Sequence, residues 1–324
     1  MANPRHFLSC DWGTSSFRLR LVRRADLAVV EERLTGQGAA AVAEAGGPGA
    51  FADYLREQVQ CVYPDAGLDP AACPVVISGM VGSSIGWHEL PYARTPFPLD
   101  GSGARTHTLE LHLDEGQRTS VMLVSGVRTE SDVMRGEESE IIGLFAGEEF
   151  ARFADRCTLV LPGTHSKHVR IGGGKMTGFR TFMTGEVFAV LRRHSILRHS
   201  TEELPGAAAP QGEERDAFAE GVRRGGQGDL LGALFRVRTR ELLDALPAKS
   251  NTWFLSGVLV GAELASLRDG SGPVLVCAGE RFRDVYGPAL EELHLEREHL
   301  VAASGLVENA IVRGHARLLN TFAV

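Results

Sequence analysis

Two short segments, one in each half of the chain, combine glycine with hydroxyl-bearing and charged residues in a way that suits phosphate binding. They are DWGTSS at Asp11–Ser16 and PGTHSK at Pro162–Lys167. Glycine lets the backbone come close to a ligand, and free N–H groups and hydroxyls can bind phosphoryl oxygens. A carboxylate such as that of Asp11 can hold a hydrated Mg²⁺ ion beside them. Ordinary turns contain the same residue types, so it is the recurrence of the pattern that favours phosphate over a plain turn.

The residues around each segment predict a β-hairpin with these candidates at its tip. An apolar stretch from Phe7 leads to Asp11, and after the tip Phe17, Leu19 and Leu21 alternate with arginines. Alternation with a period of two is typical of a half-buried strand. The second segment lies in TLVLPGTHSKHVRI (158–171), which repeats this design. We therefore expect a duplicated α/β domain, with lobes at 1–150 and 151–324 and a nucleotide cleft between them.

Several other segments place glycine or charged residues where a predicted strand ends, which is where α/β proteins build their sites. In PVVISGMVGSSIGW (74–87) a buried strand opens into a glycine loop, and in VMRGEESEIIGLFAG (133–147) a helix is expected to begin at Glu137 after a strand at 120–127. We also expect a strand up to Leu255, a turn at Ser256–Gly257 and then a helix. The remaining expectations are helices at 49–62 and 307–322, a surface loop at 204–218, and strand–turn–helix units at 179–195 and 273–293.

Composition limits the possible functions. The chain has 324 residues, of which 44% are hydrophobic and 23% charged, and its net charge is −7. This balance is ordinary for a two-domain cytoplasmic protein and argues against a general nucleic-acid binder. No segment has the length and apolar character of a membrane span or signal peptide. The five cysteines lack CxxC spacing, which indicates reduced thiols and neither disulfides nor a cysteine metal site.

Six motifs, taken in order, resemble the 2-dehydro-3-deoxygalactonokinase family of the sugar kinase, Hsp70 and actin superfamily. They are DWGTSSFR (11–18), GMVGSSIGW (79–87), VMRGEES (133–139), LPGTHSKHV (161–169), FRTFMTGE (179–186) and FLSGVLVGAE (254–263). The resemblance implies an α/β fold of two actin-like (ribonuclease H-like) lobes. It also implies transfer of the γ-phosphate of ATP to the terminal 6-hydroxyl of 2-dehydro-3-deoxy-D-galactonate, in galactonate catabolism.

The resemblance suggests how the nucleotide would be held. We assign Asp11 to the shell of a Mg²⁺ ion, through water, as the metal-binding residue. The candidates for nucleotide binding are Gly13, Thr14 and Ser15 in the first tip, Gly163, Thr164, Ser166 and Lys167 in the second, and Gly257 near the adenosine. Two alternatives stay open: Lys167 can be an ordinary surface residue of a strand, and Gly257 can be a packing glycine.

On the acceptor side we assign Gly82, Ser83 and Trp87 to the sugar acid, and Arg135 to its carboxylate, because a guanidinium matches a carboxylate. Related families often place an Asp in the second hairpin, but this one carries His165, so the base must come from elsewhere. We expect Glu137 to be the general base, with Glu138 as its rival. Acidic residues at a helix start can also simply offset the helix dipole, in which case Glu186 or Asp132 are alternatives.

Two further predictions concern metal binding by histidines and the possible functions of the protein. His165 and His168 lie three apart on a predicted strand and should face opposite sides, so they are not expected to share a metal. The alternative functions are another sugar or sugar-acid kinase, a polyphosphate or nucleotide phosphatase, or a nucleotide-gated regulatory protein. A polyphosphate channel would need a basic groove, which the net charge of −7 does not indicate. We expect a small sugar acid as partner, neither nucleic acid nor membrane, and a possible homo-oligomer.

Overall fold

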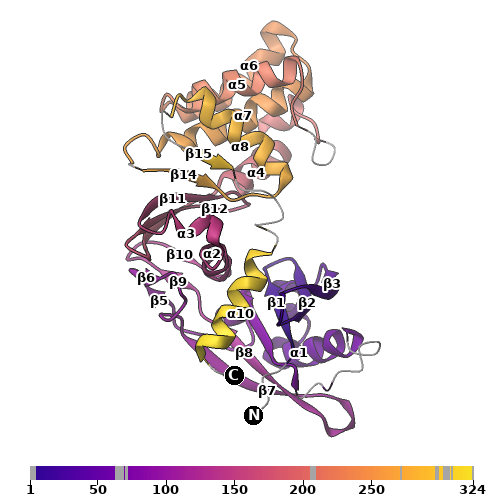
Figure 1. Cartoon of the computed structure of the whole chain (residues 1–324). Helices are drawn as coiled ribbons and strands as arrows, with labels where there is room; N and C mark the ends of the chain where they lie inside the picture. The colour runs from indigo at the N-terminus through magenta and orange to yellow at the C-terminus, as the bar shows by residue number, and fades with distance from the viewer. Residues whose placement is uncertain are drawn as a thin grey trace. The chain divides into compact units, whose positions relative to one another are not determined.

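The computed structural model describes residues 5–62, 69, 72–204, 209–270, 272–295, 299–301, 307 and 309–322. The chain divides into two compact units (Figure 1). Unit 1 comprises Met1–Asp155, Gly172–Gly178 and Leu306–Val324, and unit 2 comprises Arg156–Ile171 and Phe179–Gly305.

Unit 1 is built on a mixed six-stranded sheet. The strand order is β3 (Val29–Thr35), β2 (Phe17–Arg23), β1 (His6–Trp12), β4 (Val75–Gly79), β8 (Arg118–Val124) and β7 (Thr106–His112). Strands β3, β2 and β1 run antiparallel to one another, β1, β4 and β8 are parallel, and β7 runs antiparallel to β8. The predicted first hairpin is therefore confirmed as β1 and β2.

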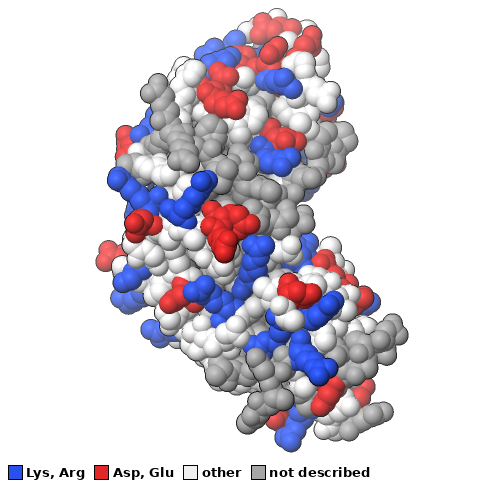
Figure 2. Space-filling view, viewed as in Figure 1, with Lys and Arg blue, Asp and Glu red and all other residues white. Residues whose placement is uncertain are grey.

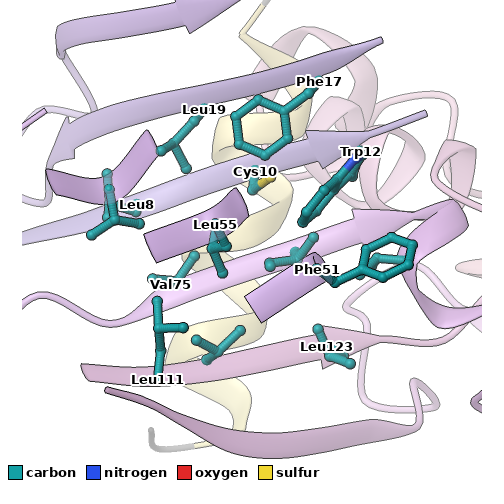
Figure 3. Close-up of a cluster of buried hydrophobic side chains, with 14 of the residues drawn as sticks. Leu8, Cys10, Trp12, Phe17, Leu19, Phe51, Leu55, Val75, Leu111 and Leu123 are labelled. Atoms are coloured by element: carbon teal, nitrogen blue, oxygen red, sulfur yellow. The ribbon is translucent and has the colours of Figure 1, made fainter. Parts of the chain in front are cut away.

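The two faces of this sheet differ in chemistry. Side chains alternate between the faces of a strand, so Leu8, Cys10 and Trp12 of β1 point to one side, where they join the apolar core under α1 (Ala39–Val62) (Figure 3). Phe7, Ser9 and Asp11 have the opposite parity and point to the other side, where Phe7 and Ser9 are buried and Asp11 is partly exposed. The first face is thus apolar, and the second combines apolar with polar residues.

This second face carries the C-terminal helix. The ring of His315 on α10 (Ala310–Phe322) is hydrogen-bonded through Nδ1 to Ser9 Oγ at 2.8 Å and through Nε2 to Ser78 Oγ at 3.0 Å. Figure 1 shows α10, in yellow, beside the sheet of unit 1. Gly314 approaches α2 (Glu137–Phe145) so closely that a Cβ there would overlap the carbonyl of Ser139. The prediction put this helix in the second lobe, but these contacts place it in unit 1.

Unit 1 also contains short elements. They are η2 (Met80–Gly82), β5 (Ala93–Arg94), β6 (Phe97–Pro98), η3 (Asp114–Gly116), β9 (Val127–Arg128), β10 (Val133–Met134) and α3 (Glu148–Ala151). Strands β10, β9 and β5 form a small sheet, and β6 pairs with the first residues of β13 (Lys175–Phe182).

Unit 2 repeats the strand order of unit 1. Its sheet runs β15 (His299–Val301), β14 (Val274–Val276), β11 (Arg156–Leu161), β12 (Ser166–Gly172) and β13, with β11, β14 and β15 parallel. In both units the first three strands are sequential neighbours and the fourth adds beside the first. This repetition confirms the predicted duplication, with one hairpin tip in each copy.

The helices of unit 2 correct one prediction. They are α4 (Thr184–His194), η4 (Ile196–His199), α5 (Glu213–Gly225), α6 (Leu230–Asp244), α7 (Ala248–Ala265) and α8 (Glu280–Glu292). The expected strand up to Leu255 and turn at Ser256–Gly257 are wrong, because both lie inside α7. A short apolar run does not distinguish a buried helix from a strand. The predicted loop at 204–218 includes residues 205–208, outside the described part, and ends earlier than expected because α5 begins at Glu213.

Two surface properties of the described part bear on function. Basic and acidic side chains are interspersed on the face shown in Figure 2. In the described ranges, no helix has the length and apolar character needed to span a bilayer.

Candidate active site

The tip of the first hairpin, Gly13–Ser16, is held by backbone contacts that leave its hydroxyls exposed. The N–H of Ala39 donates to the Gly13 carbonyl at 2.9 Å, and that of Ala40 to the Thr14 carbonyl at 3.2 Å. Gly38 has no room for a side chain, because a Cβ would overlap the backbone of Thr14 and Ser15. The start of α1 therefore fixes the tip, while the side chains of Thr14 and Ser15 remain free of the core.

Asp11 lies at the end of β1, directly before this tip. Its neighbours across the sheet are Arg18 on β2 and Ser78 on β4. The pKa of Asp11 is raised, mainly by burial; Arg18 lowers it, and the negative charge of Glu137 raises it further. The sheet and α2 thus bring Asp11 and Glu137 close enough to repel each other.

The acidic residues in the first turn of α2 point in different directions. Glu138 is fully buried; its Oε2 accepts the Gly136 N–H at 2.7 Å and its Oε1 accepts the Ser139 hydroxyl at 3.2 Å. Glu137 is partly exposed, and its Oε2 accepts the backbone N–H of Arg135 at 3.0 Å. Adjacent helical residues point about 100° apart, so only one of the pair faces outward.

Glu140 is a residue that the sequence interpretation missed. Burial, followed by the charges of Glu137 and Asp11, raises the pKa of Glu140 to about 8. Residues three apart share a helix face, so Glu137 and Glu140 lie on the side of α2 that faces Asp11. The i, i+3 spacing in GEESE was the available signal.

These three carboxylates fit a hydrated Mg²⁺ ion, because the ion prefers oxygen ligands and a cation would offset their mutual repulsion. Over the described ranges, no group of three or more His, Cys, Asp or Glu side chains is placed so that it could hold a metal ion.

Buried Glu138 gives a pH-dependent prediction for stability. Burial, and secondarily Glu137, raises its pKa from 4.5 to about 8. Between these two pH values the unfolded chain releases this proton and the folded chain keeps it, so ionisation favours unfolding and stability falls as the pH rises. We expect Glu138→Gln to remove this contribution, on the order of 3–5 kcal/mol across the window.

The measurement is the free energy of unfolding by urea from pH 4 to 9. With Glu138→Gln, the free energy of unfolding should fall less steeply as the pH rises, and the remaining fall is the part due to Glu140. The control Glu148→Gln, at an exposed site, should keep the parental slope. A Glu138→Gln curve parallel to the parental one would show that the buried carboxyl is ionised in the folded protein.

Arg135 occupies a niche in unit 1 with unused hydrogen-bonding capacity. Its guanidinium lies over the Tyr92 ring, 4.2 Å from the centroid, and its Nη2 donates to the Leu90 carbonyl at 3.3 Å. Its Nε and Nη1 are buried and find no acceptor in the described structure. A Cβ on Gly82 would lie 2.9 Å from Nη1, so the glycine provides the space that this side chain occupies.

The other predicted acceptor residues are placed differently. Ser83 is almost fully buried and its hydroxyl donates to the Met80 carbonyl at 2.7 Å, where it closes the η2 turn. Trp87 is partly buried and packs against the apolar core of unit 1. Of the residues assigned to the sugar acid, the structure therefore brings Gly82 and Arg135 together.

Unit 2 contains a pocket of about 260 Å³ that the sequence did not reveal. Backbone and hydroxyl groups of two turns line one part, and aromatic and basic side chains line much of the rest. The lining includes Gly163, Thr164, Thr184, Gly185, Phe188, Arg192, Arg193, Trp253, Ser256, Phe282 and Tyr286.

The second tip meets the start of α4 as the first tip meets the start of α1. A Cβ on Gly185 would lie 2.7 Å from the Gly163 carbonyl oxygen, and the Glu186 N–H donates to the Thr164 carbonyl at 3.1 Å. In each unit a glycine before or within the first turn of a helix makes room for the hairpin tip. Here the predicted Thr-Gly-Glu turn is itself the first turn of α4.

Three residues predicted to bind the nucleotide lie in surroundings that differ from those expected. Ser166 is fully buried and its hydroxyl donates to Glu263, so its side chain is not available to phosphate. Lys167 is 4% exposed, so it is not an ordinary surface lysine, and its Nζ donates to the His165 carbonyl at 2.8 Å. Gly257 faces α5, where a Cβ would overlap the Phe218 carbonyl. This glycine packs two helices, while its neighbour Ser256 lines the pocket.

The two histidines have separate partners. His165 Nε2 lies 2.5 Å from Glu186 Oε2 at the surface, and His168 Nε2 lies 2.9 Å from Glu263 Oε1 in the interior. The two side chains point to different surroundings, as their spacing predicted.

The chain is similar in sequence and fold to known proteins. The family model for 2-keto-3-deoxy-galactonokinase matches residues 11–314. Relatives named 2-dehydro-3-deoxygalactonokinase include one from Rhizobium meliloti (strain 1021), 35% identical over 280 residues (85% of this chain, 84% of the relative), and one from Escherichia coli (strain K12), 32% identical over 277 residues (81% and 80%).

A solved structure from Sinorhizobium meliloti that bears the same family name covers 97% of this chain and 96% of its own, with a TM-score of 0.78 and 30% identity. The resemblance first indicated by six short motifs thus extends over nearly the whole sequence and fold. The chain belongs to the 2-dehydro-3-deoxygalactonokinase family.

Proposed function

We propose that the protein transfers the γ-phosphate of ATP to the terminal 6-hydroxyl of 2-dehydro-3-deoxy-D-galactonate. The names of its relatives support the kinase activity and the sugar acid. The observation that carries the acceptor assignment is the guanidinium of Arg135, with two buried nitrogens that have no acceptor in the described structure. It lies two residues from Glu137, whose carboxylate accepts the Arg135 N–H. The cation proposed for the acidic substrate and the carboxylate proposed as the base therefore belong to neighbouring residues of one turn.

We assign the nucleotide to the pocket of unit 2. Aromatic side chains such as Trp253 and Tyr286 suit the flat base. Phosphate would lie toward Gly163 and Thr164, beside the N-terminus of α4, where free N–H groups and the helix dipole favour negative charge. The buried Lys167 would add positive charge from behind this tip.

In unit 1, the first tip would supply the phosphate-binding groups. Gly13, Thr14 and Ser15 would bind phosphoryl oxygens, and Asp11, with Glu137 and Glu140 nearby, would hold Mg²⁺ through water. Bound in this way, Mg²⁺ would neutralise charge on the phosphates. Positioning and neutralisation are the main demands of phosphoryl transfer, and in our assignment Glu137 accepts the proton of the 6-hydroxyl.

The direct test is ADP release by the purified protein with a panel of acceptors. We expect turnover with 2-dehydro-3-deoxy-D-galactonate and little with unmodified hexoses or with water alone. Faster release with another sugar acid would change the substrate assignment. Release of ADP that is independent of any acceptor would instead favour the phosphatase alternative.

Arg135→Lys tests the carboxylate assignment. A lysine keeps the charge but loses the planar set of donors, so we expect the KM for the sugar acid to rise by the equivalent of roughly 1.5–3 kcal/mol, with little change in the KM for ATP. Steady-state kinetics with each substrate varied in turn makes the measurement. Arg118→Lys, at an exposed ion pair with Glu110 in the same unit, is the matched control. Equal changes in both KM values would remove Arg135 from the acceptor site.

A further inference from the structure

Glu263 on α7 lies at the centre of a buried hydrogen-bond network in unit 2. Its Oε1 accepts the Ser166 hydroxyl at 2.6 Å and lies 2.9 Å from His168 Nε2. Its Oε2 accepts the hydroxyls of Tyr286, at 2.9 Å, and Thr184. The side chain is only 2% exposed, so these four groups take the place of water around the carboxylate.

The four partners come from three elements, of which two line the proposed nucleotide pocket and the third directly follows a turn that lines it. Ser166 and His168 begin β12, directly after the tip that contains Thr164. Thr184 opens α4 and Tyr286 belongs to α8, and both line the pocket. Glu263 itself is absent from the lining. One carboxylate thus joins the phosphate side of the pocket to the side formed by α8, without reaching the ligand space.

A network of this kind resists rearrangement. Hydrogen bonds to a charged acceptor are stronger than those between neutral groups, and a buried donor that loses its acceptor bears the full cost of desolvation. Ser266 extends the network, since its hydroxyl donates to the Glu263 carbonyl at 2.8 Å and lies 3.3 Å from His168 Nδ1. The three elements are therefore held in one arrangement relative to α7.

We propose that Glu263 is a positioning residue that sets the geometry of the nucleotide pocket by holding β12, α4 and α8 against α7. This inference rests on the proposed nucleotide site in unit 2. It gives a role to Glu263, the last residue of the motif FLSGVLVGAE. Gly257 of the same motif packs two helices.

Glu263→Gln tests this role because it keeps the size of the side chain and removes its charge and one acceptor oxygen. The dissociation constant for ADP, measured by calorimetry, should rise about tenfold, and the KM for ATP should rise with it. The KM for the sugar acid should stay near the parental value. If Glu263 contributed only to stability, Glu263→Gln would lower the melting temperature and leave the ratio of the two KM values unchanged.

Ser166→Ala provides a second, milder variant that removes one donor and leaves the carboxylate. Ser166 is fully buried and lies outside the pocket lining, so an increase in the ADP dissociation constant must act through the network. The double variant should bind ADP no more weakly than Glu263→Gln alone, because residues of one network are not additive. If Glu263→Gln does not fold, an ADP dissociation constant for Ser166→Ala equal to the parental one overturns the proposal.

Thr252→Val is the matched control on the same helix. Its hydroxyl is equally buried and bonds the carbonyls of Ala248 and Glu202, away from the Glu263 network. It should lower the melting temperature without weakening ADP binding. If the parental protein binds ADP and Glu263→Gln binds it equally well, the role of Glu263 is wrong; if the parental protein binds no ADP, the nucleotide pocket itself is wrong and the inference falls with it.

Discussion

Asp11→Asn is expected to lower kcat by about 10–100-fold while the protein stays folded, since groups that support a metal through its water shell typically contribute this much to activity. The amide keeps the shape of the side chain but loses the negative charge at the end of β1. The Mg²⁺ concentration that gives half-maximal rate should also rise. Kinetics at several Mg²⁺ concentrations, each with saturating ATP and sugar acid, make the measurement.

Misfolding is not expected to account for this loss. The pKa of Asp11 is raised, mainly by burial and also by Glu137, so the folded protein disfavours its charged form. A neutral amide should therefore leave the melting temperature at pH 7 unchanged or higher. Asp26→Asn, at a half-exposed ion pair with Arg23 in the same unit, is the control and should keep parental kcat. Near-parental turnover of Asp11→Asn at saturating Mg²⁺ would mean that the first tip is an ordinary turn.

Glu137→Gln should lower kcat by about 10²–10⁴-fold, the contribution of a positioned general base. Nucleotide binding should change little, because the groups proposed to hold the base and phosphates in unit 2 are unchanged. The acidic limb of the kcat profile should flatten, since the group whose protonation stops the reaction has been removed. Single-turnover measurements separate the chemical step from product release.

Glu138→Gln is the internal comparison for this prediction. Glu138 is fully buried, and its pKa of about 8 means that it is mostly protonated at pH 7. An amide can replace the neutral acid there, so we expect nearly parental kcat. An exchange of the two phenotypes would identify Glu138 as the base. If neither variant slows the chemical step tenfold, the role passes to another acid, of which Glu140 is the nearest candidate in unit 1.

Some features of this protein followed directly from the local sequence. Alternation on either side of Asp11 predicted the hairpin of β1 and β2, and the charged segment after Gly136 predicted the start of α2 at Glu137. These predictions succeeded because strand alternation, turn chemistry and helix starts depend on neighbouring residues. The order of the six motifs likewise indicated the family before any contact between distant residues was known.

Other features depended on which elements pack together, and the sequence did not determine them. The run before Gly257 fits a strand or a buried helix equally well, and only its packing against α5 makes it α7. Ser166 belongs to a segment that resembles a phosphate-binding turn, yet its hydroxyl donates a hydrogen bond to Glu263, 97 positions away. Burial and hydrogen-bond partners of this kind are set by residues far apart in the chain.

The same distinction applies to the proposed base and its surroundings. The sequence favoured Glu137 and Glu138 over Glu186 and Asp132, because the first two follow the Gly136 turn. The fold decided which one turns inward: Glu138 enters the interior beneath α2, while Glu137 shares a face with Glu140 toward Asp11. It also placed the C-terminal helix, through His315, on the face of β1 that carries Ser9 and Asp11. Sequence thus determined which residue types stand at each turn, and tertiary packing decided which of them remain free to act, because only packing removes a side chain from water.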